Sequence, residues 1–160
     1  MKILWIKSIK VILKHEGGYV NDPVDPGGET NMGISKRAYP DLDIKGLTKE
    51  KAEEIYYKDY WLKSKAPQVP DELRLIYFDM VVNMGKSRAV KILQTAVNAK
   101  GVKTDIDGGI GPQTISNSLK SGLEPARLRS YRVKYYADLV NRKTSLEKYW
   151  YGWYRRATQV

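Results

Sequence analysis

The chain has 160 residues, enough for one well-packed domain or for two small subdomains that share a core. It contains no cysteine and only one histidine, which excludes a disulfide framework and a cysteine nucleophile and disfavours a histidine-based metal site or a Ser-His-Asp triad. Its 28 lysines and arginines exceed its 18 acidic residues, and the formal net charge of +10 indicates a negatively charged partner such as murein, teichoic acid, lipopolysaccharide or nucleic acid.

The first predicted element is a helix that ends at Glu16. Trp5, Ile9, Ile12 and Glu16 follow one another at steps of three or four residues, so a helix places this glutamate on its apolar face. Two glycines then end the helix. Partial desolvation disfavours the charged form of a carboxyl group, which suits a general acid. Lysines interrupt the N-terminal apolar run, so we expect neither a signal peptide nor a membrane span.

A loop rich in glycine, proline and acidic residues follows this helix. Asp22, Asp25 and Glu29 all lie in it, and prolines and glycines around Asp25 favour a tight reversal that would bring this side chain opposite Glu16. Glycoside hydrolysis requires such a second carboxylate. Thr30 offers a hydroxyl that could orient a water molecule. Asp22 stays a rival to Asp25, and either aspartate could instead only hydrogen-bond to the turn backbone.

Helical patterns continue along the middle of the chain. Thr48 is a suitable N-cap for a helix that extends to about residue 62. Prolines then precede a second pattern over residues 71–84, whose wide apolar stripe predicts the central core helix, and Gly85 ends it. Asn83 lies near the end of this helix, where it could cap the helix or face a cleft.

The second half of the chain is also predicted to be helical. We expect helices over 87–99, from Pro112, and from about Pro125, and after a break at Thr144-Ser145 one more over 146–157. The last two should form a hairpin. The D-x-D-G of the loop over 104–112 lacks the spaced ligands of a calcium loop and predicts a turn. In the hairpin, tyrosines and tryptophans should pack inward, and its arginines should stay at the surface; these arginines include Arg127, Arg132, Arg155 and Arg156.

Two segments resemble one known family. The run Glu16-Gly-Gly-Tyr-Val-Asn-Asp-Pro, followed by Asp25-Pro-Gly-Gly-Glu-Thr-Asn-Met-Gly-Ile, resembles the signature of glycoside hydrolase family 108, N-acetylmuramidases of phage endolysins and bacterial secretion systems. The order of glutamate, aspartate, threonine and a Gly-Ile pair is also similar to the loop of phage-type lysozymes. That pattern supplies an acid, an aspartate and a threonine that holds water.

The C-terminal half adds a second resemblance. Leu93-Gln-Thr-Ala, with Asp107-Gly and Gly111-Pro-Gln-Thr, is similar to the small peptidoglycan-binding module that follows the catalytic part in family 108 proteins. The GWYRR segment near the end resembles the closing pattern of that family. We therefore expect a catalytic region over residues 1–86 and a helical peptidoglycan-binding region over 87–160, packed into one globular unit.

These resemblances imply a mainly α, lysozyme-like fold and hydrolysis of the β-1,4 bond between N-acetylmuramic acid and N-acetylglucosamine. Glu16 would be the general acid, Asp25 (or Asp22) the second carboxylate and Thr30 the residue that positions water. Tyr19, Asp22 and Asn83 would contact the substrate. No metal and no organic cofactor is implied.

The expected partner is bacterial peptidoglycan, and the expected role is lysis of a bacterial cell or remodelling of its wall. We expect a monomer that is made in the cytoplasm without a signal peptide, does not insert stably into a membrane and reaches the wall with a holin or a dedicated exporter. Two alternatives remain: a non-catalytic wall-binding or secretion-accessory protein, and a basic nucleic-acid-binding protein. The acidic loop disfavours nucleic acid, because its carboxylates would face phosphates.

Overall fold

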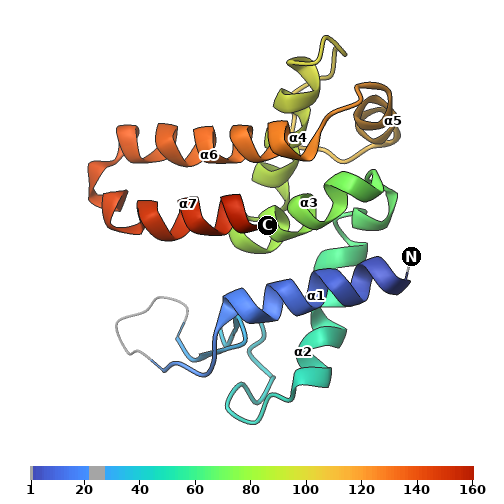
Figure 1. Cartoon of the computed structure of the whole chain (residues 1–160). Helices are drawn as coiled ribbons and strands as arrows, with labels where there is room; N and C mark the ends of the chain where they lie inside the picture. The colour runs from blue at the N-terminus through green and yellow to red at the C-terminus, as the bar shows by residue number, and fades with distance from the viewer. Residues whose placement is uncertain (1, 22–27) are drawn as a thin grey trace. The chain divides into compact units, whose positions relative to one another are not determined.

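The computed structural model describes residues 2–21 and 28–160. Its elements, in chain order, are α1 (Lys2–Glu16), β1 (Thr30–Asn31), β2 (Ile34–Ser35), α2 (Lys49–Ile55), the π-helical η1 (Tyr56–Leu62), the 3-10 helix η2 (Ala66–Gln68), α3 (Asp71–Met84), α4 (Lys86–Asn98), α5 (Pro112–Lys120), α6 (Pro125–Arg142), the 3-10 helix η3 (Thr144–Tyr149) and α7 (Trp150–Gln159) (Figure 1). The predicted mainly α, lysozyme-like fold class is confirmed. Among the described helices, none is both long and apolar enough to cross a bilayer.

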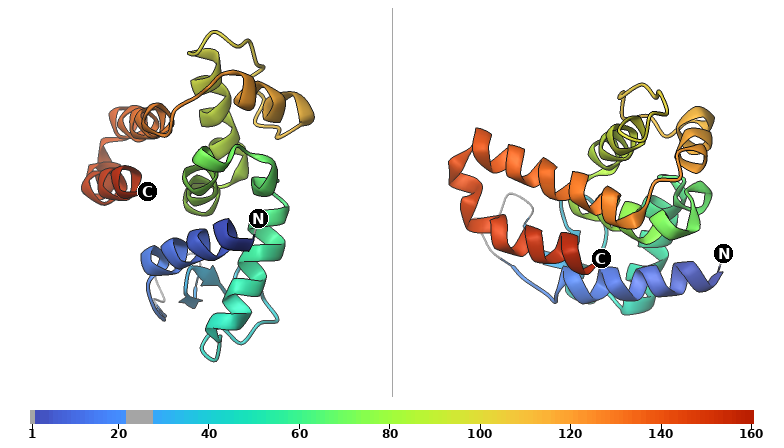
Figure 2. Two further views of the ribbon diagram at one scale, coloured as in Figure 1. Left: turned by 45° about the vertical axis from the view of Figure 1, so that its right-hand side comes forward. Right: turned by 45° about the horizontal axis from the view of Figure 1, so that its top comes forward.

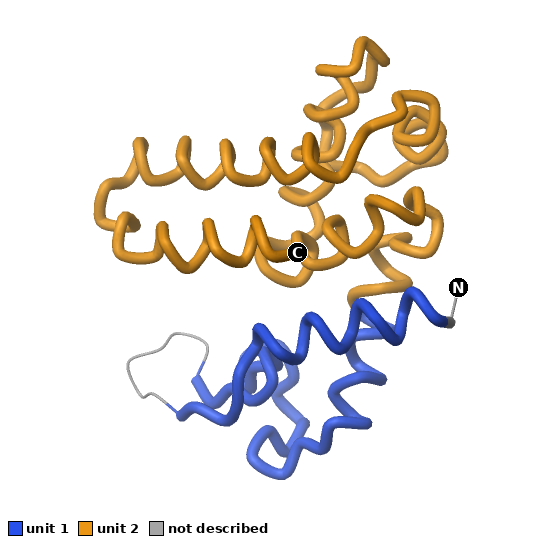
Figure 3. Tube along the Cα trace, in the orientation of Figure 1, with its two compact units in different colours: residues 1–59 blue, residues 60–160 orange. Residues whose placement is uncertain are grey.

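The chain divides into two compact units, residues 1–59 and residues 60–160 (Figure 3). Unit 1 contains α1, the short hairpin of β1 and β2, α2 and the start of η1. Two of the predicted helix bounds are confirmed: Thr48 caps α2 by accepting a 3.2 Å hydrogen bond from the Lys51 amide, and α1 ends at Glu16. The helix predicted to extend to about residue 62 is α-helical only as far as Ile55 and continues as the π-helical η1. Ile9 and Ile12 of α1 are buried, as the apolar stripe predicts.

Unit 2 is organised around α3. This helix contacts α4 and α6, and α6 in turn contacts α7. Residues 76–81 are buried at every position, so α3 is covered on all sides, as expected of a core helix. Helices α6 and α7 lie side by side as the predicted hairpin, which all three ribbon views show (Figure 2). The rings of Tyr136 and Trp153 stack between them, with centroids 5.0 Å apart.

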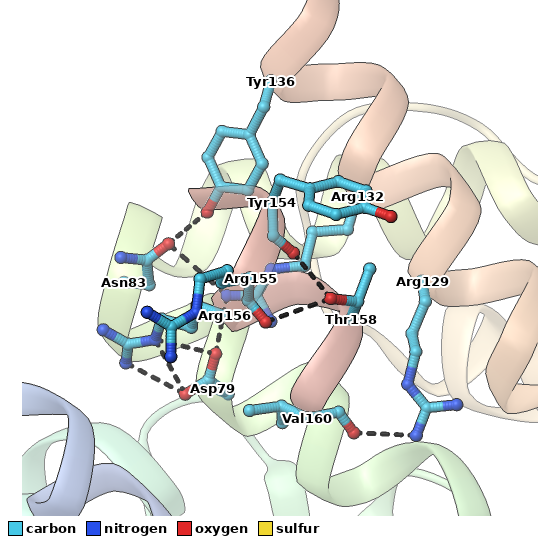
Figure 4. Close-up of polar contacts among 10 residues, drawn as sticks. All are labelled: Asp79, Asn83, Arg129, Arg132, Tyr136, Tyr154, Arg155, Arg156, Thr158 and Val160. Carbon is cyan, nitrogen blue, oxygen red and sulfur yellow. Dashed lines mark hydrogen bonds and ion pairs between the residues drawn. The ribbon is translucent and has the colours of Figure 1, made fainter. Parts of the chain in front are cut away.

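The predicted surface position is wrong for two of the hairpin arginines. Arg127 and Arg155 are exposed, but Arg132 is fully buried and Arg156 is largely buried. Both reach Asp79, a fully buried carboxylate in the middle of α3 (Figure 4). The Asp79 Oδ2 lies 2.6 Å from the Arg132 Nη2, and its Oδ1 lies 2.9 Å from the Arg156 Nη2. A buried carboxylate requires a partner of opposite charge, which explains why these arginines are drawn inside.

Candidate active site

Glu16 is the last residue of α1. Gly17 follows with φ +72, a left-handed conformation that terminates the helix and that glycine adopts at little cost. The Glu16 side chain is half-buried, between the exposed glycines after it and the buried stripe before it. The helix therefore fixes the direction of the carboxylate, while part of the group stays accessible.

The hairpin of β1 and β2 forms the other side of this site. Thr30 pairs with Ser35 and Asn31 with Ile34, so only Met32 and Gly33 make the turn. Both have positive φ, +48 and +77, which is the sign pattern of a type I′ hairpin turn. Positive φ is unfavourable for methionine, so surrounding contacts must hold this turn in place.

The turn lies directly against the Glu16 carboxylate. An ideal Cβ atom added to Gly33 would be 2.6 Å from Glu16 Oε2 and 2.5 Å from the hydroxyl oxygen of Tyr56, which leaves no room for a side chain. The buried Tyr56 donates a 2.9 Å hydrogen bond from this hydroxyl to the carbonyl oxygen of Met32. A strained turn, a buried tyrosine and the end of α1 thus confine one oxygen of Glu16.

Thr30 and Tyr19 lie on the two ends of the acidic loop. Val20 and Thr30 exchange two backbone hydrogen bonds of 2.8 Å, which join these ends. The Thr30 hydroxyl is part-buried and donates to the Gly28 carbonyl oxygen at 3.3 Å. Asp22 and Asp25, the two aspartates considered for the second carboxylate, lie outside the described residues.

Tyr19 is exposed and forms a hydrogen bond with an acidic residue, Glu29. Its hydroxyl donates a 2.8 Å hydrogen bond to Glu29 Oε1. This hydrogen bond, together with burial and the negative charge of Glu29, raises the pKa of Tyr19 above its ordinary value. Tyr19 as a whole residue is 42% exposed, so it remains accessible to a ligand while its hydroxyl is hydrogen-bonded.

Asn83, the remaining residue expected in the site, belongs to α3 in unit 2. Its side-chain oxygen accepts hydrogen bonds from the Tyr136 hydroxyl and, at 3.5 Å, from Arg132 (Figure 4). The amide is therefore part of the network around Asp79 within unit 2. That network ties α3 to α6, and it gives Asn83 a structural role beside any contact with substrate.

Three residues that support the site were not predicted from the sequence as parts of it: Met32, Gly33 and Tyr56. The glycine of the Asn-Met-Gly-Ile run suits a two-residue turn, but methionine instead of asparagine, aspartate or glycine precedes it, so the run is only a weak hairpin signal and does not indicate what lies against the turn. Among the described residues, no group of three or more acidic, histidine or cysteine side chains is arranged to hold a metal ion.

Comparison with known proteins identifies the family of the chain. Residues 9–85 match the family model of glycosyl hydrolase 108, and residues 88–158 match that of a predicted peptidoglycan domain. None of the curated protein sequences compared with the chain matches it. The solved structure of SagA from Brucella abortus is similar to the chain, with 30% sequence identity and a TM-score of 0.79 over 99% of this chain and 92% of that one. The chain belongs to glycosyl hydrolase family 108 and is a glycoside hydrolase that acts on peptidoglycan.

Proposed function

We propose that the chain is an N-acetylmuramidase that cleaves the β-1,4 bond between N-acetylmuramic acid and N-acetylglucosamine, with Glu16 as the general acid. The observation that carries this assignment is the confinement of the Glu16 carboxylate between the end of α1, Gly33 and Tyr56. A general acid must be held within hydrogen-bond reach of the leaving oxygen, and a carboxyl group fixed on one side and open on the other meets that need.

The second carboxylate of the reaction is assigned to Asp25, with Asp22 as its rival. One of them would act on the face of the sugar ring opposite Glu16, and Thr30 would orient the water. Tyr19 would contribute its ring to the substrate-binding surface, together with Asp22 and Asn83. In this scheme residues 1–86 carry the reaction and residues 87–160 hold the murein. The monomeric state and the use of a holin or dedicated exporter stay predictions from the sequence.

The test of Glu16 is its replacement by glutamine, which keeps the shape of the side chain and removes the transferable proton. The rate at which reducing ends are released from purified sacculi should fall by about a thousandfold or more, because the general acid contributes a large share of the acceleration. Glu50→Gln, an exposed carboxylate of the same unit, is the matched control and should keep wild-type activity. Retention of more than about a tenth of wild-type activity by Glu16→Gln would refute the assignment.

The bond that is cleaved is tested by the chemistry of the products. Muramidase hydrolysis leaves a reducing N-acetylmuramic acid, which borohydride converts to muramitol. Cleavage at the other glycosidic bond would give glucosaminitol instead, and a lytic transglycosylase would give a 1,6-anhydro sugar with no reducing end. Mass spectrometry of borohydride-treated products separates these three outcomes.

The two aspartates are separated by Asp25→Asn and Asp22→Asn. We expect Asp25→Asn to lose more activity, and the reverse ranking would transfer the second role to Asp22. The stereochemistry of the product, followed by NMR, gives the geometry. Retention would indicate carboxyl groups about 5–5.5 Å apart, and inversion would indicate about 6.5–9.5 Å.

A further inference from the structure

Unit 2 carries a hollow between α4 and α6 that has no part in the proposed chemistry. Its volume is about 320 Å³. Its apolar lining comes from Ile92 on α4 and from the rings of Tyr131 and Tyr135 on α6. A second hollow of about 450 Å³ shares Tyr131 and Lys134 with the first, so the two are adjacent along α6. We call the pair the α4–α6 trough. Its size is in the range of cavities that hold small ligands.

The rim of the trough is positively charged. Arg88 and Lys91 on α4 and Arg127 and Lys134 on α6 line it, and all four side chains are exposed. Among the described residues that line the two hollows, Asp138 is the only acidic one, and it pairs with Lys134 at 2.7 Å. Arg127 pairs with Glu124 at 3.6 Å, which leaves Arg88 and Lys91 as the excess cations. Positive charges thus remain in excess, and the trough is complementary to a ligand that carries carboxylates.

The interior of the trough is lined by aromatic rings, whereas its rim is charged. Tyr131 and Tyr135 are half-buried, so their rings are held by packing while part of each ring faces the hollow. Aromatic rings offer an apolar body with a polar tip, the combination that fits the apolar face and hydroxyl edge of a pyranose. Aromatic rings flanked by cations match a sugar that bears an acidic substituent.

Peptidoglycan combines these groups, since its muramic acid carries a stem peptide with free carboxylates. The residues named above fall within 88–158, the segment that matches the predicted peptidoglycan domain. We propose that the α4–α6 trough is the murein-binding site of unit 2, with the tyrosine rings against the sugar and Arg88, Lys91 and Lys134 around the stem-peptide carboxylates. This proposal rests on the proposed function for its ligand, but not on the assignment of Glu16.

The experiment measures binding, not turnover. The probe is a soluble disaccharide tetrapeptide, N-acetylglucosamine linked to N-acetylmuramic acid, titrated by calorimetry into the full chain that carries Glu16→Gln. In that background, a trough variant combines Arg88→Gln, Lys91→Gln and Lys134→Gln. A matched control combines Lys86→Gln, Lys103→Gln and Lys120→Gln, three exposed lysines of unit 2 that do not line the trough. Both variants lose the same charge.

The trough variant should bind the probe about tenfold more weakly, and the control should change by less than about twofold, because only the trough charges contact carboxylates. The same loss in both variants, or no loss in either, would overturn the proposal. A probe with amidated carboxyl groups should bind equally weakly to both variants. A short DNA duplex that responds to the trough variant as strongly as the murein probe does would show a general polyanion surface and also overturn it.

The sugar contribution is tested with the free tetrapeptide. It should bind more weakly than the disaccharide tetrapeptide, and equal affinities would overturn the assignment of the rings. Release of reducing ends by the wild-type chain is measured in parallel. If the wild-type chain releases no reducing ends and the trough variant still loses binding, the proposed function is refuted and the trough proposal stands. If the wild-type chain releases reducing ends and the trough variant binds the probe as well as the control does, the trough proposal alone is refuted.

Discussion

The position of Glu16 depends on the absence of a side chain at Gly33. An added methyl group would meet the Glu16 carboxylate and the Tyr56 hydroxyl, and its residue would hold φ at +77. The site therefore requires glycine here for two reasons, the backbone conformation and the space. The two requirements are separable, because other glycines of the chain have positive φ but open surroundings.

We predict that Gly33→Ala lowers kcat by about 10- to 100-fold, since small displacements of a catalytic group have costs of this size. Gly101→Ala is the matched control, because Gly101 also has a positive φ (+84) but nothing within 4 Å of an added Cβ. Both variants should lose about 1–2 kcal/mol of unfolding free energy from the strained backbone. Gly33→Ala should lose more than this in total, because its methyl group also overlaps Glu16 and Tyr56. Equal kcat values for the two variants would show that Gly33 serves only the turn.

Tyr19 offers a prediction that depends on pH. Because Glu29 raises the pKa of Tyr19, the hydrogen bond between them stabilises the folded chain below the ordinary pKa of tyrosine, and this contribution is lost as pH rises through the higher folded value. Glu29→Gln should lower the pKa of Tyr19 toward its ordinary value. NMR of chain labelled at the tyrosine Cζ measures it, with Tyr19→Phe to assign the signal. An unchanged titration would exclude the coupling.

For single residues, the sequence predicts the location of some side chains well and of others poorly. The spacing of Trp5, Ile9, Ile12 and Glu16 places the glutamate correctly on α1, because that inference needs only helical geometry. Arg132 is misplaced, because its partner Asp79 is remote in sequence. A signal was nevertheless available: Leu128, Arg132 and Tyr136 are spaced by four residues and are the buried stripe of α6.

At the scale of elements, one carboxylate joins three helices. Asp79 of α3 binds Arg132 of α6 and Arg156 of α7, so the hairpin of α6 and α7 is fastened to the core by charge as well as by stacked rings. Within the described residues, Arg132 Nε and Nη1 are buried without a hydrogen-bond partner. The network therefore depends strongly on its single negative charge.

Asp79→Asn should destabilise the chain by about 3–5 kcal/mol, because it leaves two guanidinium groups buried beside a neutral side chain. Asp138→Asn is the control: it breaks a 2.7 Å pair with Lys134 at the surface and should cost less than about 1 kcal/mol. Urea unfolding followed by circular dichroism compares them. A loss below 1 kcal/mol for Asp79→Asn would mean that packing alone holds the hairpin.

The helices themselves are the part of the fold that the sequence predicts best. Caps and breakers act locally, so Thr48, Pro112 and Gly85 indicate the bounds of α2, α5 and α3 within a few residues. The π-helical geometry of Tyr56–Leu62 is not predicted, since a 3.6-residue period fits the same residues. The β1–β2 hairpin is also not predicted, because strands of two residues are too short to show the alternation of apolar and polar residues.

At the scale of the whole chain, motifs and compactness give different boundaries. The family models meet between residues 85 and 88, whereas the compact units meet between 59 and 60. The reason is that α3 is matched with the N-terminal family segment but packs against α4 and α6. A sequence motif covers residues that are close together in the chain, so it does not indicate which helices pack against one another. The expected division into residues 1–86 and 87–160 therefore describes proposed roles in function, while the packing within unit 2 begins earlier.

Net charge is the other property of the whole chain, and it leads to a prediction about salt. A chain of charge +10 should be attracted to murein over distances set by the Debye length, which falls from about 30 Å at 0.01 M salt to about 8 Å at 0.15 M. We therefore expect kcat/KM on purified sacculi to fall by about tenfold over this range, with kcat nearly unchanged, because attraction affects encounter and not the chemical step.

The control for this prediction changes the substrate and leaves the chain intact. Sacculi whose stem-peptide carboxylates have been amidated keep the sugar backbone but lose the negative charge, so their hydrolysis should depend little on salt. Comparing the two substrates removes any effect of salt on the stability of the chain, which would act on both. If the two salt profiles coincide, the positive charge does not guide the chain to murein and serves solubility instead.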